Sequence, residues 1–290
     1  MESAQSLKLR LHSISSTRQI TRSMQMIAST KVQKTLRRMQ ENAPFVEHFG
    51  EIVRNIMRFA PSARHMYAAP PDVGCSAIIA VSGNRGLCGS YNSNVCREAV
   101  TQIKRMNRDA RCVTIGWKMR DHLRRRNFAV ERAFDGASES PFYETARDAG
   151  GVALELYKNG AVDSVFIVYT RYESALSLVP RADRILPLSA PDEGERDPRG
   201  RQMCFEPGAD GVLDYVAPFY LSARVYGAML SAAACEQSAR VVSMDAASKN
   251  CADIIERLSL QYNRLRQSGI TQELNEIVSG AEALLTTEES

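Results

Sequence analysis

The segment SGNRGLCG, from Ser82 to Gly89, contains the residue types that could bind a phosphate group. It follows a short apolar run and precedes a helical pattern, which is where phosphate-binding loops occur in α/β proteins. The segment matches neither G-x-G-x-x-G nor G-x-x-x-x-G-K-[ST], because no Lys followed by Ser or Thr ends it. We therefore favour a tight structural turn, and a nucleotide-dependent α/β enzyme that uses this loop is the alternative.

Residues for covalent or metal catalysis form no recognisable pattern. The sequence has no G-x-S-x-G, and its four histidines are scattered without H-E-x-x-H or paired spacing. The seven cysteines include no C-x-x-C, which favours reduced thiols in a cytoplasmic protein. We expect no catalytic residues, no bound metal and no cofactor.

Charge is concentrated at the start of the chain. The net charge is +4, but residues 1–40 hold eight Lys or Arg and one acid, so that segment carries +7 and the rest −3. Such a segment predicts an acidic or polyanionic partner. A basic coiled-coil protein that binds nucleic acid is a second alternative, although interleaved aromatic residues and a DNA-binding motif are missing.

The segment RQSGITQEL, from Arg266 to Leu274, is unusual for the surface of a helix. Gly269 costs about 1 kcal/mol in a helix relative to alanine. Its presence beside small and hydroxyl side chains suggests close approach of another backbone. An unremarkable polar helix face is the competing interpretation.

The basic N-terminal segment and the segment Arg266–Leu274 both lie in stretches with the pattern of a long helix. Residues 5–58 read as a helix, in which three apolar sets step by 4 and 3 and are offset from one another: Leu7, Leu11 and Ile14; Ile20, Met24 and Ile27; and Val32, Leu36 and Met39. A second helix begins at about Gly211, and residues 219–290 contain no proline. Its apolar stripes are Cys251, Ile255, Leu258, Tyr262 and Leu265, then Ile270, Leu274, Ile277, Ala281 and Leu284. Seventy-two helical residues would span about 100 Å and need a partner, so we expect an antiparallel coiled coil of the two terminal helices.

Between these helices the pattern changes to alternating strands and helices. Strands are expected at Cys75–Ser82, Arg111–Gly116, Val162–Thr170 and within Leu176–Leu188, and helices at Asn92–Asn107, Lys118–Arg126 and Tyr143–Asn159. This alternation predicts an inserted, Rossmann-like α/β domain with a largely parallel sheet. We therefore divide the chain into helix 1–60, α/β domain 72–207 and helix 211–290, with a surface loop at 189–200 and a short extended piece at Met203–Pro207. No run of about 18 apolar residues occurs, so we expect no membrane insertion.

Three segments in this order resemble the gamma subunit of F-type ATP synthase. Ile14–Lys31 resembles the family's N-terminal signature, and Tyr262–Leu284 is similar to its C-terminal signature almost throughout. Ser82–Asn92 resembles the family's S-D-R-G-L-C-G-x-x-N loop, with Asn84 where Asp is usual. Ser231–Val242 is also close to a family stretch, and the layout of two terminal helices around an α/β insertion matches along the whole chain.

The resemblance implies a rotor subunit that is not itself an enzyme. It would couple ion flow through the membrane ring of c subunits to ATP synthesis or hydrolysis at the beta-subunit catalytic sites. Its implied partners are the alpha, beta and epsilon subunits and the c ring, with no nucleic acid. Arg22, Met24, Arg266, Gln267 and Thr271 would contact the beta subunits, with Arg22 and Met24 facing an acidic loop.

The resemblance also places the two ends of the shaft. Phe205 and Glu206 would lie in the foot near the c ring and the epsilon subunit, and Leu284 and Leu285 would form the apical bearing. The implied location is the cytoplasmic face of a bacterial plasma membrane, as a peripheral subunit, or else the inner face of a mitochondrial or plastid membrane. Because the late region offers only Cys204 where the plastid form has a cysteine pair, we expect no thiol switch.

Overall fold

A computed structural model of the chain describes residues 4–59, 66–68, 72–136, 141–188, 204–206 and 208–288, with side chains up to residue 279. By their internal contacts these residues form two compact units. One unit joins the chain's first 27 residues to those from Val242 onward, and the other runs from Ala28 to Val241. The predicted surface loop 189–200 lies outside the described residues.

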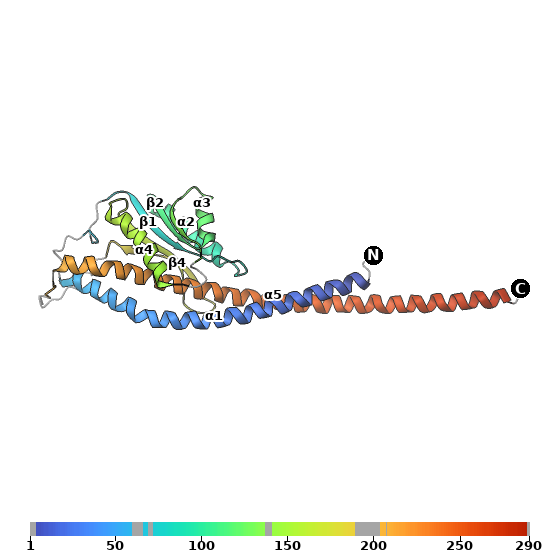
Figure 1. Cartoon of the computed structure of the whole chain (residues 1–290). Helices are drawn as coiled ribbons and strands as arrows, with labels where there is room; N and C mark the ends of the chain where they lie inside the picture. Colours follow the sequence, from blue (N-terminus) through green and yellow to red (C-terminus); the bar gives the residue numbers. More distant parts are fainter. Residues whose placement is uncertain are drawn as a thin grey trace. The chain divides into compact units, whose positions relative to one another are not determined.

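Two long helices begin and end the chain (Figure 1). Helix α1 spans Ala4–Phe59 and passes through Pro44 without a break. Helix α5 spans Ala209–Glu288 and passes through Pro218. Both predicted helices are therefore confirmed, with ends within two residues of those expected.

The buried face of α1 follows an unbroken heptad pattern that differs from the predicted one. Ile20 and Ile27 were placed on an inward stripe, but their side chains are 59% and 58% exposed. Most of the positions that are buried or half-buried step by 4 and 3 from Leu7 to Ile56: 7, 11, 14, 18, 21, 25, 28, 32, 35, 39, 42, 46, 49, 53 and 56. Met24, Leu36, Arg38 and Gly50, which adjoin this set, are also buried or half-buried. Steps of 4 and 3 are the geometry of a coiled-coil seam. Arg18, Thr21 and Gln25 occupy inward positions in this seam. A pattern based on apolar residues alone would not place polar side chains there, and it therefore predicts a different register.

Within each unit α1 and α5 run antiparallel. In the unit 28–241, the Phe49 ring stacks on the Phe219 ring with centroids 6.2 Å apart, and Gly227 packs against the Asn42 amide. In the other unit, Gln25 Nε2 donates a hydrogen bond of 3.2 Å to Asp245 Oδ1. The paired residue numbers add to 268, 269 and 270, so one number rises as the other falls. The predicted antiparallel coiled coil is confirmed.

A five-stranded sheet lies between the two helices in the sequence, in the order β3-β2-β1-β4-β5. Strands β1 (Cys75–Val81), β2 (Asp109–Ile115), β3 (Ala129–Phe134) and β4 (Ser164–Tyr172) are parallel, and β5 (Leu178–Leu186) pairs antiparallel with β4. Strand β3 was not expected, because only its Val130, Ala133 and Phe134 are even partly buried and its pattern is polar for a strand in a parallel sheet. The extended piece predicted at Met203–Pro207 is not a strand over its described residues, Cys204–Glu206.

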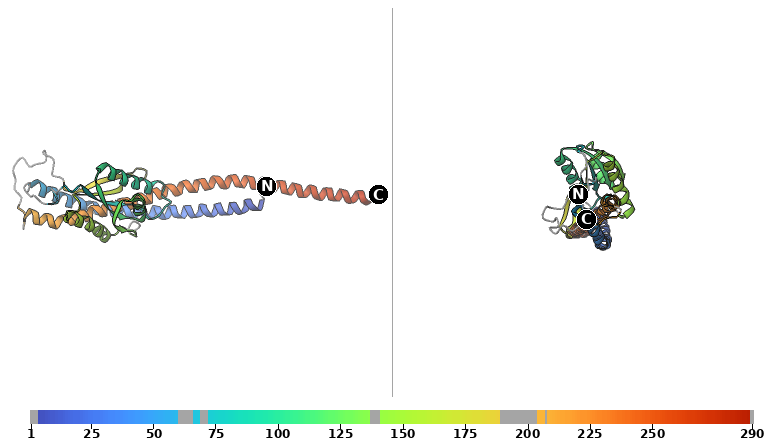
Figure 2. Two further views of the ribbon diagram at one scale, coloured as in Figure 1. Left: turned by 90° about the horizontal axis from the view of Figure 1, so that it is seen from above. Right: turned by 90° about the vertical axis from the view of Figure 1, so that its left-hand side faces the viewer.

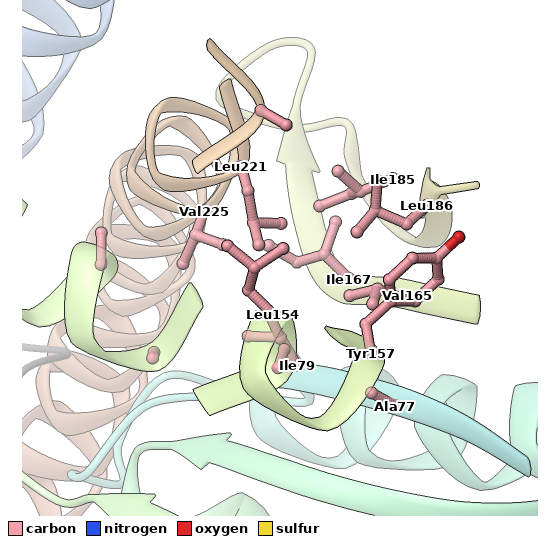
Figure 3. Packing of buried hydrophobic residues seen from close by; sticks show 14 of the residues in the cluster. Ala77, Ile79, Leu154, Tyr157, Val165, Ile167, Ile185, Leu186, Leu221 and Val225 are labelled. Atoms are coloured by element: carbon pink, nitrogen blue, oxygen red, sulfur yellow. The ribbon is translucent and has the colours of Figure 1, made fainter. Parts of the chain in front are cut away.

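Helices cover both faces of this sheet and form two cores. Helices α2 (Tyr91–Met106) and α3 (Trp117–Arg124) pack on one face through a cluster that includes Val95, Met119 and Leu123. Helix α4 (Tyr143–Lys158) and the first part of α5 pack on the other face. Figure 3 shows Leu221 and Val225 of α5 meeting Leu154 of α4 above β1 and β4. The expected Rossmann-like α/β domain is confirmed.

Candidate functional site

The far end of α5 extends past the first turn of α1 (Figure 2). Because paired positions near this end add to 270, Ala4 lies opposite about residue 266. Every described side chain from Asn263 to Ser279 is exposed. From Arg266 to Ser279, about 20 Å of helix, no other described helix accompanies α5.

The unaccompanied segment carries apolar side chains in water. Leu265, Ile270, Leu274, Ile277 and Val278 are 41–68% exposed. By contrast, the preceding predicted stripe is covered as far as Tyr262, since Cys251 and Leu258 are buried and Ile255 and Tyr262 are half-buried, while its last member, Leu265, is exposed. Contiguous exposed apolar side chains on a soluble protein mark an interaction surface.

The predicted contact residues lie on the unit that joins the chain's two ends. Arg22 on α1 and Arg266, Gln267 and Thr271 on α5 are exposed, and Met24 is half-buried. Thr271 donates its hydroxyl to the carbonyl of Gln267 at 3.0 Å, so both belong to one turn of helix. At Gly269 an added Cβ would meet nothing within 4 Å, so the space for a close neighbour is open.

The two ends of the predicted shaft are less fully described. Phe205 is half-buried, packed against the core on the α4 face, and Glu206 is exposed. The backbone of α5 includes Leu284 and Leu285, but their side chains lie outside the described residues.

The loop Ser82–Gly89 is fixed from both sides. The amide of Asn92 accepts a hydrogen bond from the Gly83 N–H at 2.9 Å and donates to the Arg85 carbonyl at 3.1 Å. Asn84, where the family usually has Asp, accepts from the Trp117 N–H at 2.9 Å. The loop follows β1 and is held to the beginning of α2 by the Asn92 side chain. It is held to the beginning of α3 by the Asn84 side chain.

A buried ion pair on α5 closes the other side of this loop. Arg240 Nη2 lies 2.7 Å from Glu236 Oε1 and donates to the Gly86 carbonyl at 3.3 Å. The side chains of Glu236 and Arg240 are only 2% and 9% exposed. A buried charge is tolerated when it is paired and hydrogen-bonded, so this pair fixes the loop to α5.

Sequence reasoning missed this pair. A spacing of four residues on a helix is equally typical of a solvated surface pair. The available signal was the resemblance of both the loop and Ser231–Val242 to family segments, which are about 150 residues apart in sequence and in contact in the fold.

The loop geometry argues against phosphate binding. A Cβ added at Gly83 would lie 2.7 Å from Glu236 Oε2, so a carboxylate oxygen occupies the space beside the loop backbone. A phosphate group placed there would face a buried negative charge at short range, which is strongly unfavourable. The arrangement supports the structural-turn interpretation.

The thiols near the sheet are buried and have low reactivity at neutral pH. Cys88 and Cys235 pack with Tyr91 beside the loop. Burial raises the pKa of Cys235 to about 12, that of Cys112 to about 12 and that of Cys96 to about 11. A thiol with so high a pKa has almost no thiolate at neutral pH and reacts slowly.

The part of the chain that the structure describes holds no group of three or more His, Cys, Asp or Glu side chains able to bind a metal ion. No helix among those residues is both long enough and apolar enough to cross a membrane.

Solved structures share this fold. The chain aligns with a subunit of the Euglena gracilis mitochondrial ATP synthase with a TM-score of 0.67 and 19% identity, covering 99% of this chain and 96% of that one. It also aligns with a chain from the central stalk and c ring of the Tetrahymena thermophila mitochondrial ATP synthase, with a TM-score of 0.58 and 22% identity over 79% of this chain and 99% of that one. The fold is therefore that of the central-stalk subunits of ATP synthases.

Sequence comparison leads from this class to one family. A family model described as ATP synthase matches residues 3–284. The chain is 37% identical to an ATP synthase gamma chain of Alkaliphilus metalliredigens over 97% of this chain and 98% of that one. It is 34% identical to a gamma chain of Acetobacterium woodii described as sodium ion specific, over 98% and 99%. The chain belongs to the ATP synthase gamma chain family, the central-stalk subunits of F-type ATP synthases.

Proposed function

We propose that this chain is the rotor shaft that couples ion flow through a membrane ring of c subunits to ATP synthesis or hydrolysis at beta-subunit catalytic sites. The observation that carries the proposal is the end of α5, where the helix has no partner among the described residues and exposes both apolar and polar side chains. A ring of alpha and beta subunits around this end would cover those side chains. Rotation of a one-sided surface within such a ring would bias each catalytic site by different contacts.

The proposed beta-subunit contacts lie on two faces of this shaft. Arg266, Gln267 and Thr271 are free of a covering helix and offer donors and acceptors to the surrounding ring. Arg22 is exposed on the basic α1, where an acidic loop of a beta subunit would meet opposite charge. Met24 is half-buried beside it, and its flexible thioether would adapt to a moving neighbour.

The remaining assignments complete the shaft. We assign Phe205 and Glu206 to the foot that meets the c ring and the epsilon subunit, and Leu284 and Leu285 to the apical bearing. The functional division is then two shaft helices, 1–60 and 211–290, with the α/β domain 72–207 at the foot. The subunit would be peripheral, on the cytoplasmic face of a bacterial plasma membrane. In this role the chain binds no nucleotide itself and has no catalytic residues, a proposal supported by the carboxylate beside the loop Ser82–Gly89.

A truncation of α5 in the assembled complex tests this function. Removing residues 266–290 deletes the exposed segment and leaves the paired part of the coiled coil intact. We expect ATP-driven rotation and ion pumping to fall at least tenfold while ATP hydrolysis by the alpha and beta subunits continues. Rotation and pumping at wild-type rates would contradict the proposal.

A matched control changes exposed side chains outside the proposed contacts. Arg147→Gln and Arg171→Gln alter exposed residues of the α/β domain and should leave pumping unchanged. Nucleotide binding by the isolated chain would instead favour the enzyme alternative.

A further inference from the structure

We propose that a cleft between α2 and α3 binds a small anion that carries several phosphate groups. The cleft has a volume of about 550 Å³, which lies within the range of small-molecule sites. It lies on the face of the sheet opposite α4 and the first part of α5. Its position and charge are independent of the proposed rotor function.

Two short basic stretches form the walls. Arg97, Thr101 and Lys104 are spaced by 4 and 3 on α2, so they share one face of that helix. Lys118, His122 and Arg125 repeat the spacing along α3 and its C-terminal cap, followed by Arg126. The two faces line the same cleft, which therefore holds five Lys or Arg side chains and one imidazole. No carboxylate is among the lining residues.

These five cations form no ion pair with a carboxylate among the described residues. Arg97, Lys104, Lys118, Arg125 and Arg126 make no ion pair with any residue that the structure describes. Arg125 and Arg126 donate only to backbone carbonyls, those of Asp121 and His122, and the Lys118 ammonium lies over the Trp117 ring. Asp121, an acid on α3, pairs with Arg120. Five cations around one hollow repel each other, and a polyanion would relieve that repulsion.

The charges reach the floor of the cleft. Cys96 and the half-buried Val100 form its apolar part. Burial lowers the pKa of His122, and the positive charges of Arg126 and Arg125 lower it further. The same two guanidinium groups partly offset the burial that raises the pKa of Cys96. The positive potential of Arg125 and Arg126 therefore acts at both His122 and Cys96.

The shape and donors select the ligand class. Guanidinium and ammonium groups on two opposing walls can bind neighbouring phosphate groups of one ligand. Each guanidinium group can bind a phosphate with two hydrogen bonds. Thr101 and Ser93 also line the cleft and add neutral hydroxyl donors. The shared chemistry is clustered phosphates, which a soluble polyphosphate or a phospholipid head group with more than one phosphate would supply.

Equilibrium dialysis of the full chain against radiolabelled inorganic tripolyphosphate tests the proposal. We expect one bound tripolyphosphate per chain, with affinity that falls steeply as salt rises. The double variant Arg97→Gln/Arg126→Gln removes one guanidinium from each wall and should weaken binding by roughly tenfold or more. A matched control, Arg147→Gln/Arg171→Gln, makes the same change in net charge on other surfaces and should bind like the wild type.

Vesicles containing cardiolipin, whose head group carries two phosphates, distinguish the source of the phosphate. Tripolyphosphate binding that is lost in the cleft variant and kept in the control supports a soluble ligand. Vesicle binding that depends on Arg97 and Arg126, without tripolyphosphate binding, supports a head group as the ligand of the same cleft. The proposal is overturned if neither probe binds, or if both double variants lose affinity equally. Far-UV circular dichroism identical to the wild type checks that the cleft variant is folded.

Discussion

Gly83 and Glu236 provide a sharp test of how the loop Ser82–Gly89 is fixed to α5. A Cβ added at Gly83 would lie 2.7 Å from Glu236 Oε2, 2.8 Å from Glu236 Cδ and 3.1 Å from Asn92 Oδ1. Neither neighbour can withdraw freely, because Arg240 holds the carboxylate and the Gly83 N–H itself holds the Asn92 amide. Gly83→Ala should therefore cost about 1–3 kcal/mol of unfolding free energy, as overpacking does elsewhere.

Removing the carboxylate should change that cost. Glu236→Ala alone leaves the buried Arg240 without its ion-pair partner and should cost about 3–5 kcal/mol. In that background the methyl group introduced by Gly83→Ala loses its two shortest contacts, and of its three nearest atoms only Asn92 Oδ1 remains. Gly83→Ala should then cost under about 1 kcal/mol, so the two costs should fall short of additivity by about 1–2 kcal/mol.

Urea unfolding followed by tryptophan fluorescence measures this coupling. Trp117 is the chain's one tryptophan, and its backbone N–H donates to the Asn84 side chain of the loop. Its fluorescence emission therefore reports on the α/β domain. Gly86→Ala is the matched control, because a Cβ there meets nothing within 4 Å and should change stability by under about 0.5 kcal/mol. Costs that add within about 0.5 kcal/mol would refute the proposed contact.

Three further outcomes are expected. Asp163→Asn should lower the unfolding free energy at neutral pH by about 1–3 kcal/mol: burial alone would raise the pKa of Asp163, but hydrogen bonds from Ser164, Gly74 and Val73 and the charge of Arg108 outweigh it and lower that pKa. This contribution is present above the ordinary carboxyl pKa and is lost as pH falls through the lowered one, so urea titrations of the two proteins should converge below about pH 4, and a constant difference would contradict the assignment. Arg18→Met should raise the unfolding free energy of the isolated chain by about 1 kcal/mol, and with it the melting temperature, because Arg18 Nε is buried without a hydrogen-bond partner among the described residues. An unchanged or lower melting temperature would contradict this expectation. Maleimide at pH 7 should label the exposed Cys204 within minutes and the buried Cys88, Cys96, Cys112 and Cys235 only in urea, and ATPase activity of the complex should not respond to a dithiol reductant.

The long helices and the parallel sheet could be predicted because their patterns are long and regular. Apolar residues every 3.5 positions and short buried runs between helices are signals that tertiary packing reinforces. The seam of α1 was harder, since Arg18, Thr21 and Gln25 lie inward while Ile20 and Ile27 lie outward. An apolar pattern follows hydrophobicity, whereas the seam follows the geometry of the partner helix. An outward isoleucine is understandable once another protein is expected to cover it.

Strand β3 and the Glu236–Arg240 pair were missed for different reasons. Strand β3 lies at the edge of the sheet, where one side is open and charged residues such as Glu131 and Arg132 are tolerated. The ion pair depends on a contact between residues about 150 positions apart, and no local pattern encodes such a contact. The resemblance of both segments to one family was the signal that could have connected them.

The unaccompanied part of α5 has a consequence for how the complex assembles. From residue 266 to residue 279, α5 has no partner helix among the residues that the structure describes, and a helix that packs against nothing is only marginally stable in water. In the free chain this segment should exchange between helix and coil on a microsecond timescale. Folding of this end would then be completed only on entry into the ring, so part of the binding energy would be consumed in ordering it. Amide hydrogen exchange would show this as protection beyond residue 266 that appears only in the assembled complex.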